Sequence, residues 1–402
     1  MKNLLFVTWD SDQTNYLENL FFPILAGLRV KGGFECAVLQ FSWAAEGEVA
    51  RIGALAADLG IQYTHHPIMR KPHPVLGTLL TLWKGSGFLK GYLEENPTHI
   101  LMPRSTMPAL MVNRIHSWIN SQGIKLVFDA DGLPLEERAD FAGLRRSSYQ
   151  YRLLKKQETK LLLQADKILT RSQKAIDIHV GNIGEVHRHK FAKVSNGRHP
   201  GFFTFNAAAR ARIREEYGLL DGDRLFVYTG TLGPQYAWEE MLDVFESYRQ
   251  AHAGSEWLLL SQSTDFLKGR IPAHLKDAIH LLQVPFSEMP AYLSAADVAF
   301  SLRIPVPSMA GIAPIKLGEY LLMGLPTIAS TGIGDGDSLV SVFPGSIHPY
   351  NHSKASRLPK ALRWLSDLPE KDRSRIREKA VLCFGLDGSV KEYVEALGFT
   401  TD

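Results

Sequence analysis

The stretch "DRLFVYTGTLGPQYAWEEML", residues 223–242, decides the fold of this chain. It opens with an apolar run of the kind that forms a strand buried on both faces of a sheet, and the run ends at Gly230. A loop containing a second glycine, Gly233, follows, and from residue 237 onward the apolar residues have helical spacing. Strand, loop and helix in this order form the repeating unit of a parallel sheet.

The same unit recurs on both sides of this stretch. Helical segments such as 15–33 and 107–123, both ending in glycine, separate apolar runs. The strand candidates are residues 3–9, 34–41, 98–103, 124–131, 256–262, 280–284 and 326–330. The alternation predicts an α/β protein with two Rossmann-like, doubly wound parallel-sheet domains facing across a cleft, with functional residues in the loops that follow strands.

The domain boundaries follow from where this alternation stops. We expect an N-terminal domain over residues 1–195 and a C-terminal domain over 206–380. Residues 196–205 are rich in Gly, Asn and Pro and lack any period, so we interpret them as the linker. The last segment, 381–402, reads as a C-terminal helix that could pack back on the N-terminal domain.

The composition excludes several classes of protein. With 402 residues, of which 45% are hydrophobic and 22% charged, the chain reads as soluble and globular, and its net charge of +3 does not indicate a nucleic-acid partner. Cys36 and Cys383 are far apart, so we expect neither disulfides nor a zinc site, and a cytoplasmic location. No apolar run suits a signal peptide or reaches the roughly 18 residues that span a membrane.

The loop of residues 230–233 is a candidate anion site. Gly230 and Gly233 precede a helix, and backbone amides at a helix N-terminus attract phosphate. The G-x-x-G spacing is not the dinucleotide fingerprint, and the loop after the first strand, "WDSDQTN", has no glycine, so nicotinamide chemistry is disfavoured. A tight strand-to-helix turn without a ligand is the alternative.

The second candidate is "APIKLGEYLLMGLPTIAS", residues 313–330. Its helix places Lys316, Glu319 and Tyr320 on one face. A lysine in the first turn opposes the helix dipole, at a cost of a few tenths to about 1 kcal/mol, so a negative group should compensate. Two alternatives remain: Glu319 pairs with Lys316 at the surface, or Lys316 binds a diphosphate while Glu319 accepts hydrogen bonds from sugar hydroxyls.

Residues 313–330, followed by "TGIGDGDSL", resemble the donor-site signature of glycosyltransferase family 4, whose members are retaining enzymes of the GT-B fold. The closest likeness is to the subgroup with Pro-x-Lys-Leu-x-Glu-Tyr on the donor helix. Other segments agree with the family in order, and they are "NGRHPGFF", "YTGTLGPQYAWEEML", "LSAADVAFSLR" and, more loosely, "MPRSTMPAL" and "FDADGLPLEE".

The resemblance implies a set of donor-binding residues. Glu319 would bind the ribose of a nucleotide-sugar, next to Leu317 on the same helix. Lys316 and the amides of the phosphate loop would meet the diphosphate, and the loop residues are Gly230, Thr231 and Gly233. No metal and no other cofactor is implied.

The chain departs from the family pattern at several positions. Thr231 stands where many members have arginine, and "PQYAW" lacks their lysine. Gly311 falls where a glutamate is usual, and Asp131 where the subgroup has arginine. Lys316 and Arg303 are therefore the candidates for stabilising charge on the leaving diphosphate.

The N-terminal half supplies candidates for the acceptor side. Arg104 and Ser105 follow one predicted strand, and Asp129 and Asp131 follow the next. Asp129 is a candidate catalytic carboxylate that orients the acceptor hydroxyl, or it caps its own turn. Asp12, with Asp10 and Gln13, lies in the first loop and is a weaker candidate. The adjacent His65 and His66 point apart on a strand, which argues against a metal site.

The implied activity is transfer of a hexose, without metal, from a nucleotide-diphosphate donor to a glycan or lipid-linked acceptor, in bacterial surface polysaccharide biosynthesis. Residues 144–174 carry nine Lys or Arg against Glu158 and Asp166, so this segment either docks on the anionic inner face of the membrane or is a solvated helix face. Rival functions are a non-hydrolysing nucleotide-sugar 2-epimerase of the same fold and an inactive sugar-nucleotide-binding protein.

Overall fold

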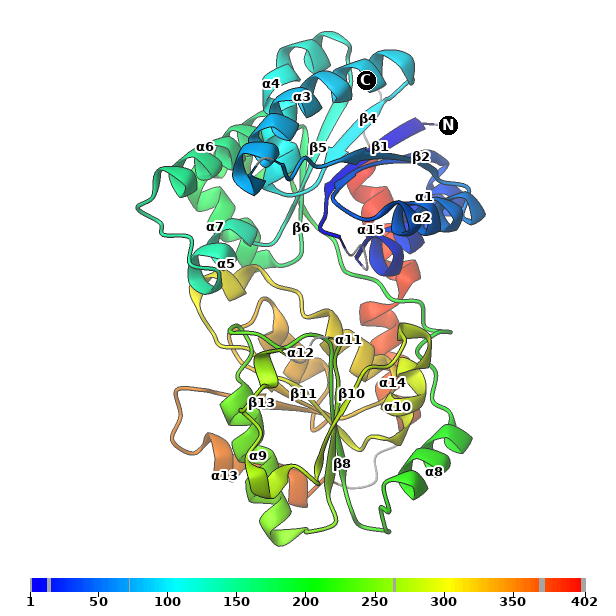
Figure 1. The fold of residues 1–402 in the computed structure, drawn as a ribbon, viewed down its shortest axis with the longest axis vertical. Helices are drawn as coiled ribbons and strands as arrows, with labels where there is room; N and C mark the ends of the chain where they lie inside the picture. The colour runs from blue at the N-terminus through cyan, green and yellow to red at the C-terminus, as the bar shows by residue number, and fades with distance from the viewer. Residues whose placement is uncertain (1, 13–15, 72, 263–264, 369–372, 399–402) are drawn as a thin grey trace. The chain divides into compact units, whose positions relative to one another are not determined.

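The computed structural model describes residues 2–12, 16–71, 73–262, 265–368 and 373–398. The chain divides into two compact units. Unit 1 consists of Met1–Gly197 together with Leu386–Asp402, and unit 2 is Arg198–Gly385. Unit 2 thus begins within the segment 196–205, and the last helix of the chain belongs to unit 1 (Figure 1).

Unit 1 is built on a parallel sheet of seven strands in the order β3-β2-β1-β4-β5-β6-β7 (Figure 1). The strands are β1 (Lys2–Trp9), β2 (Phe34–Ser42), β3 (Gln62–Pro67), β4 (Ile100–Pro103), β5 (Lys125–Asp131), β6 (Lys167–Thr170) and β7 (Phe191–Lys193). The order reverses beside β1, between β1 and β4, which is the switch point where open parallel sheets bind ligands.

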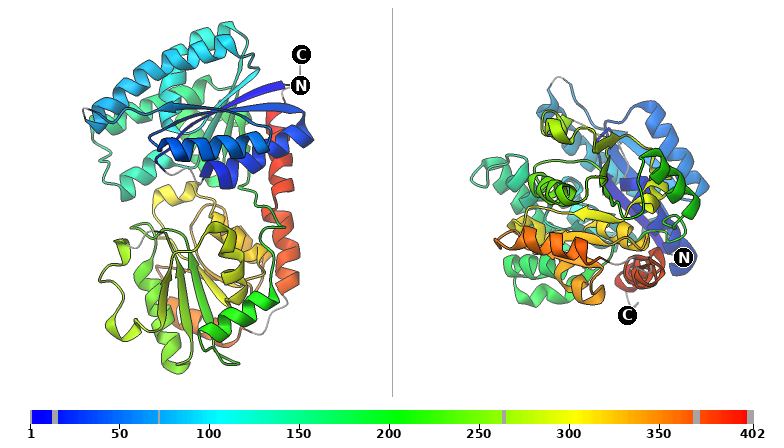
Figure 2. Two further views of the ribbon diagram at one scale, coloured as in Figure 1. Left: turned by 45° about the vertical axis from the view of Figure 1, so that its right-hand side comes forward. Right: turned by 90° about the horizontal axis from the view of Figure 1, so that it is seen from below.

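Helices cover both faces of this sheet (Figure 2). They are the π-helix η1 (Leu17–Phe21), α1 (Phe22–Gly32), α2 (Glu46–Asp58), α3 (Pro74–Glu95), α4 (Thr106–Ser121), α5 (Pro134–Phe141), α6 (Tyr149–Gln164), α7 (Gln173–Ile183), the 3-10 helix η2 (Glu185–Lys190) and α15 (Leu386–Leu397). One core joins α3, α4 and α6 to alternate strand residues such as Leu5 and Val7. Phe6, pointing to the opposite face, stacks on Phe21.

Unit 2 repeats the plan with six parallel strands in the order β10-β9-β8-β11-β12-β13. The strands are β8 (Leu225–Thr229), β9 (Glu256–Leu260), β10 (Ile279–Leu282), β11 (Val298–Ser301), β12 (Thr327–Ser330) and β13 (Ile347–Tyr350). The helices are α8 (Ala207–Glu216), α9 (Trp238–Ala251), α10 (Met289–Ala295), α11 (Ile315–Leu322), α12 (Gly336–Val342), α13 (Arg357–Ser366) and α14 (Arg373–Phe384), with short 3-10 turns η3 (Asp265–Leu267), η4 (Ala273–Leu275), η5 (Phe286–Glu288) and η6 (Pro307–Gly311).

Two cores lie on the two faces of this second sheet. Phe226 and Tyr228 pack with α9 and α13, whereas Leu225 and Val227, the alternate residues of the same strand, pack with α11 and α14. Strands buried on both faces are what the continuous apolar runs predict. The prediction of two parallel-sheet, Rossmann-like domains is confirmed.

The structure corrects one local prediction in unit 1. Within the basic segment 144–174, the apolar spacing of residues 148–169 predicts one amphipathic helix, but α6 ends at Gln164 and the next residues enter the sheet as β6. Asp166 explains the change, because its backbone N–H donates to the carbonyl of Leu126 at 2.8 Å and its carboxylate accepts from the Leu126 N–H at 2.8 Å. In the part of the chain that the structure describes, no helix is long and apolar enough to cross a membrane.

Candidate functional site

A cluster of cations and aromatic rings lies at the carboxyl ends of the central strands of unit 2. The Lys316 ammonium, in the first turn of α11, donates a hydrogen bond to Tyr228 Oη at 2.6 Å. The same ammonium lies 4.2 Å from the centre of the Tyr228 ring and 4.3 Å from the centre of the Tyr236 ring. Two aromatic faces therefore hold this lysine by cation–π attraction.

Gly230 makes room for the lysine. Its φ of 89° lies in the left-handed region, which a side chain rarely adopts. A Cβ at this position would lie only 3.0 Å from Lys316 Cε and 3.1 Å from Lys316 Nζ. The glycine is needed for both its backbone conformation and the close approach of the ammonium to the phosphate loop.

Arg303 joins the cluster from the neighbouring strand β11. Arg303 and Tyr236 form an isolated antiparallel bridge, and the guanidinium carbon lies 4.7 Å from the centre of the Tyr236 ring. Arg303 Nη2 also donates to Tyr236 Oη at 3.3 Å. Tyr236 thus contacts both Lys316 and Arg303, and we call these three residues with Tyr228 the cation cluster.

The charges in the cation cluster shift one another's ionisation. The pKa of Lys316 falls to about 8, mainly because the group is buried; Tyr236 opposes this shift and the charge on Arg303 adds to it. Burial would raise the pKa of Tyr236, but Lys316 and Arg303 outweigh it, so this pKa falls below its ordinary value. Burial and the nearby charge on Arg303 both disfavour the charged form of Lys316, so an anionic ligand would be favoured at this site.

Glu319 has a partner that the sequence did not indicate. Its Oε1 lies 2.8 Å from Nε of Arg198, and the two side chains are only 9% and 10% exposed. Burial raises the pKa of Glu319, and Arg198 and Lys316 oppose this rise. The structure shows a buried pair of Glu319 with the linker arginine and not the surface pair with Lys316 that was one of the two alternatives, and binding of ribose by Glu319 stays a prediction.

Helix α11 is fixed directly to the end of strand β8. The Tyr320 hydroxyl accepts a hydrogen bond from the Thr229 N–H at 2.9 Å and lies 3.0 Å from Thr229 Oγ1. This contact sets the position of Lys316 relative to Gly230, the residue after Thr229. Leu317, predicted to contact the donor, is buried in the core beside α11 and also lines a small pocket with Arg303.

A chain of polar contacts runs behind Arg303. The Arg303 N–H donates to Ser330 Oγ at 2.8 Å, and Ser330 Oγ lies 2.8 Å from His352 Nε2. His352 Nδ1 contacts Glu240, which also pairs with Arg357 at 3.3 Å. Burial lowers the pKa of His352, with Glu240 opposing the shift. This series of polar contacts fixes the backbone that carries Arg303.

Sequence reasoning did not find Tyr228, Tyr236, Arg198 or the residues of this polar chain. Among these residues, only Tyr236 could have been suspected from the sequence, because it stands in "PQYAW", which lacks the lysine usual in the glycosyltransferase family that the sequence resembles. The structure brings Lys316, Arg303 and Gly230 together, as the hypothesis of a diphosphate site requires. The side chain of Thr231 is exposed, while its carbonyl accepts from Tyr228 Oη at 3.1 Å. Gly233 accepts the N–H of Tyr236 at 3.0 Å in the same loop.

Unit 1 has its own cluster of charges at the carboxyl ends of β4 and β5. We call Arg104, Asp129, Asp131 and Arg171 the carboxylate–arginine cluster. Arg104 donates to Asp131 at 2.6 Å, and Arg171 donates to Asp129 at 2.8 Å. Burial would raise the pKa of Asp131, but Arg104 and Arg171 outweigh it and hold this pKa below its ordinary value.

The exposures of the two carboxylates differ. The Asp129 side chain is 0% exposed and bound by Arg171, whereas the Asp131 side chain is 32% exposed. Ser105 and Asp131 both have positive φ, 66° and 62°, which is uncommon outside glycine and typical of functional sites. Ser105 is held there by its N–H, which donates to the Asp129 carbonyl at 2.9 Å. The roles predicted for these residues stay predictions.

The first loop contributes less to this cluster. Asp10 accepts hydrogen bonds from Gln40 at 2.8 Å and from Thr8, and burial raises its pKa although Arg104 lies close enough to oppose the shift. Asp12 is exposed, and Gln13 lies outside the described residues. His65 contacts Ser42 Oγ at 2.9 Å. No group of His, Cys, Asp or Glu side chains suited to a metal ion occurs within the described ranges.

Solved structures with a similar fold include proteins in complex with UDP or a UDP-sugar. HepE from Anabaena in complex with UDP is 15% identical with a TM-score of 0.70 and 99% of each chain covered, and it is also known with UDP-glucose. Sucrose-phosphate synthase from Thermosynechococcus elongatus is 14% identical with a TM-score of 0.70 and 98% of each chain covered. UDP-GlcNAc 2-epimerase from Neisseria meningitidis, bound to UDP-GlcNAc, is 11% identical with a TM-score of 0.58, covering 98% of this chain and 99% of that one.

No protein-family profile and no curated protein sequence matches the chain. At 11–15% identity, the likeness to solved structures establishes the fold alone. Each unit has the Rossmann-like parallel sheet of GT-B proteins, so the expected fold class is confirmed.

Proposed function

We propose that the protein is a glycosyltransferase that moves a hexose from a nucleotide-diphosphate sugar to an acceptor hydroxyl, with retention of anomeric configuration. The observation that carries the proposal is the cation cluster of unit 2. Lys316 and Arg303 converge on Tyr236 beside the Gly230 loop, at the strand ends where parallel sheets bind ligands. The complexes of HepE with UDP and with UDP-glucose agree with such a donor.

The cluster suits stabilisation of a leaving diphosphate. Charge grows on the phosphate oxygens as the bond to the sugar breaks, and fixed positive groups that need not reorganise lower the energy of that state. Lys316 is fixed by two rings and Tyr228 Oη, and Arg303 by Tyr236 and the Ser330 contact to its backbone. The leaving diphosphate itself would take part in deprotonating the acceptor hydroxyl, so no separate protein base is required on this side.

Glu319 would bind the ribose hydroxyls of the donor. One of its oxygens pairs with Arg198, whose charge opposes the rise that burial causes in the Glu319 pKa and so favours the charged carboxylate. A charged carboxylate accepts stronger hydrogen bonds from hydroxyl groups than a neutral one does.

The carboxylate–arginine cluster would orient the acceptor. We infer that Asp131 contacts the acceptor hydroxyl, because it is the more exposed carboxylate, while buried Asp129 holds Arg171 and, through its Oδ1, the Asp131 N–H at 3.1 Å. The lowered pKa of Asp131 makes it a weak base, so it suits orientation better than proton removal. Arg104 and Ser105 would complete this acceptor side.

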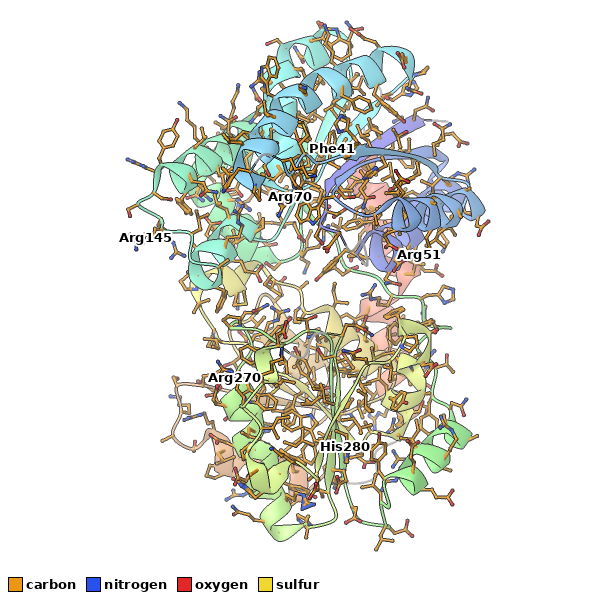
Figure 3. The ribbon with its side chains drawn as sticks, viewed as in Figure 1. Phe41, Arg51, Arg70, Arg145, Arg270 and His280 are labelled. Atoms are coloured by element: carbon orange, nitrogen blue, oxygen red, sulfur yellow. The ribbon has the colours of Figure 1, made fainter. Side chains whose placement is uncertain are left out.

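A glycan or a lipid-linked sugar is the acceptor that we propose, in bacterial surface polysaccharide biosynthesis on the cytoplasmic side of the membrane. The basic segment 144–174 is one candidate for membrane contact. Its Arg145, labelled in Figure 3, is exposed, but Lys155 is bound by Glu136 and Glu158 at 2.7 Å each. The reaction is proposed to need no metal, so chelation with EDTA should leave its rate unchanged.

Incubation with a panel of UDP-, GDP-, ADP- and CDP-sugars tests the proposal. Release of the nucleoside diphosphate, with and without a lipid extract as acceptor source, is the expected result, and Lys316→Met should reduce it by about 100-fold if this charge acts in the transition state. Appearance of an epimeric sugar nucleotide would instead favour the 2-epimerase, the rival that the fold of the Neisseria enzyme supports. Binding without any turnover would favour an inactive sugar-nucleotide-binding protein.

A further inference from the structure

Helix α3 of unit 1 exposes its large apolar side chains. Five of them lie along the same side, at exposures between 39% and 61%, and they are Val75, Leu76, Leu79, Leu80 and Trp83. Their spacing of one, three and four residues is that of a single helix face. Contiguous apolar surface of this kind is uncommon on a soluble protein and marks an interaction site.

The opposite side of α3, which faces the sheet, carries small residues together with three core leucines, Leu82, Leu89 and Leu93. Among its buried positions are Gly77, Thr81, Gly85 and Ser86. A Cβ at Gly85 would lie 2.7 Å from Met111 Sδ, and one at Gly77 would lie 2.1 Å from the Met69 carbonyl oxygen. Close packing therefore requires glycine at these two inner positions, and large apolar residues occur on the outer side of the helix as well as on the inner one.

Helix α3 is thus apolar on its outer side as well as on its inner side, whereas an ordinary surface helix has a polar outer side. The two inward hydroxyls do not change this, because Thr81 donates to the Gly77 carbonyl at 2.8 Å and Ser86 to the Leu82 carbonyl at 2.9 Å, within the helix itself. Burying the outer residues would stabilise the protein by roughly 25 cal/mol for each Å² removed from water.

Basic residues predominate around this face, although α3 ends in Glu94 and Glu95. Residues 59–93 contain no Asp or Glu, whereas Arg70, Lys71, Lys84 and Lys90 fall within them. Arg70 stacks over Trp43 at 4.5 Å beside the beginning of α3, near the buried Phe41 (Figure 3). Lys71 and Lys84 are exposed, and Lys84 follows Trp83 on the helix. Lys90 pairs with Glu94 at 3.5 Å, so the face combines apolar side chains with the positive charges of Lys71 and Lys84.

We propose that the outer face of α3 docks on an anionic phospholipid bilayer. Aliphatic residues and an exposed tryptophan suit the boundary between headgroups and acyl chains, and the basic residues suit the negative surface potential of anionic lipids. A second copy of this chain would bring two basic faces together, which opposes pairing. The inference does not depend on the proposed activity, and it places membrane contact on α3 in preference to α6.

Co-sedimentation of the full-length protein with vesicles tests this proposal. The probes are vesicles of phosphatidylcholine alone and of phosphatidylcholine with about 30% phosphatidylglycerol, a fraction that gives a clearly negative surface. We expect binding to the anionic vesicles, weakened by salt, and a loss of at least about tenfold in the triple variant Leu76→Ser, Leu79→Ser, Trp83→Ser. Thermal unfolding of this variant should match wild type, because the three side chains are exposed.

The matched control makes the same kind of change on α6, with Leu153→Ser and Leu163→Ser, both exposed in the native chain. This control should bind the vesicles as wild type does. Equal binding by the α3 variant and wild type would overturn the proposal, as would loss of binding in the α6 control alone. Absence of vesicle binding together with a dimer, seen by light scattering and lost in the α3 variant, would assign the face to a second copy instead.

Discussion

Lys316 carries its charge at a cost to the folded state. Burial lowers its pKa from the ordinary value of 10.5 to about 8, so between these pH values the unfolded chain binds more protons than the folded one. The free energy of unfolding should therefore rise with pH across this window in the ligand-free protein. A bound diphosphate would reverse the balance, because it favours the charged lysine.

This balance predicts the pH dependence of nucleotide binding. The dissociation constant for UDP, measured by calorimetry, should increase by up to about tenfold between pH 8 and 9.5, because Lys316 loses its proton over this range and UDP binding weakens. The phosphates are fully ionised over this range and do not contribute. Lys316→Arg, which stays charged, is the control and should give a flat profile. A flat profile in the wild type would argue that Lys316 does not contact the diphosphate.

Gly230 predicts a second effect of a single residue. Gly230→Ala places a Cβ 3.0 Å from Lys316 Cε at a φ of 89°, so it should destabilise the protein by about 1–3 kcal/mol and weaken UDP binding at least tenfold. Gly233→Ala is the matched control, because its Cβ would meet only the movable end of Gln235. Urea unfolding and calorimetry of both variants check this, and equal UDP affinity in the two would contradict the close-approach role of Gly230.

Part of the candidate site could be predicted from the sequence. Gly230, Lys316 and Arg303 could be proposed because glycine, a misplaced lysine and a strand-end arginine are visible in the sequence itself. Tyr236 and Arg198 could not, since their roles depend on which side chains lie opposite them in space. Nothing in the spacing of the chain shows that Glu319 meets a linker arginine.

At the scale of elements, helix α11 is attached to strand β8 by hydrogen bonds. Tyr320 on α11 bonds Thr229 at the end of β8, and this contact fixes Lys316 relative to the Gly230 loop. The latch is a buried hydroxyl, and its loss would leave the Thr229 N–H without its partner in the core. An unsatisfied buried donor costs about 1–3 kcal/mol.

Tyr320→Phe should therefore lower the free energy of unfolding by about 1–3 kcal/mol and also weaken UDP binding several-fold. Tyr393→Phe in α15 is the matched control, because that buried hydroxyl has no hydrogen-bond partner among the described residues. We expect the control to be near neutral in both measurements. Equal behaviour of the two variants in urea unfolding and calorimetry would contradict this role of the Tyr320–Thr229 hydrogen bond.

Periodicity predicted most elements but not every boundary. Residues 167–170 read as the end of a helix, since "KIL" continues the apolar spacing of α6, yet Asp166 pairs with Leu126 and turns the chain into the sheet. The competing interaction is a tertiary one. No local pattern reports it.

For the whole molecule, the order of strands explains which loops meet. In unit 2, β8, β11, β12 and β13 are neighbours in that order. Tyr236, Arg303 and His352 follow β8, β11 and β13, and Ser330 is the last residue of β12, which is why contacts link each of the four to the next. The alternation in the sequence predicted two parallel sheets, but not this order, and hence not the chain of contacts.

The path of the chain gives a second feature of this scale. After unit 2 the chain returns to unit 1, where α15 packs beside α1, and a Cβ at Gly27 would lie 2.3 Å from Val390. The Ser195 N–H donates to Glu392, and Ser389 donates to the Ser195 carbonyl at 2.6 Å. Helix α15 is therefore held within unit 1 by its packing on α1 and by its hydrogen bonds to Ser195.

Titration calorimetry of the full-length protein with UDP and UMP, in wild type and in Lys316→Met, tests the central claim most directly. The claim is that the cation cluster holds the diphosphate of a nucleotide-sugar. It predicts that wild type binds UDP at least about tenfold more tightly than UMP, and that Lys316→Met removes most of this difference while UMP affinity is kept. If Lys316→Met bound UDP as tightly as wild type, the cation cluster would not be the diphosphate site.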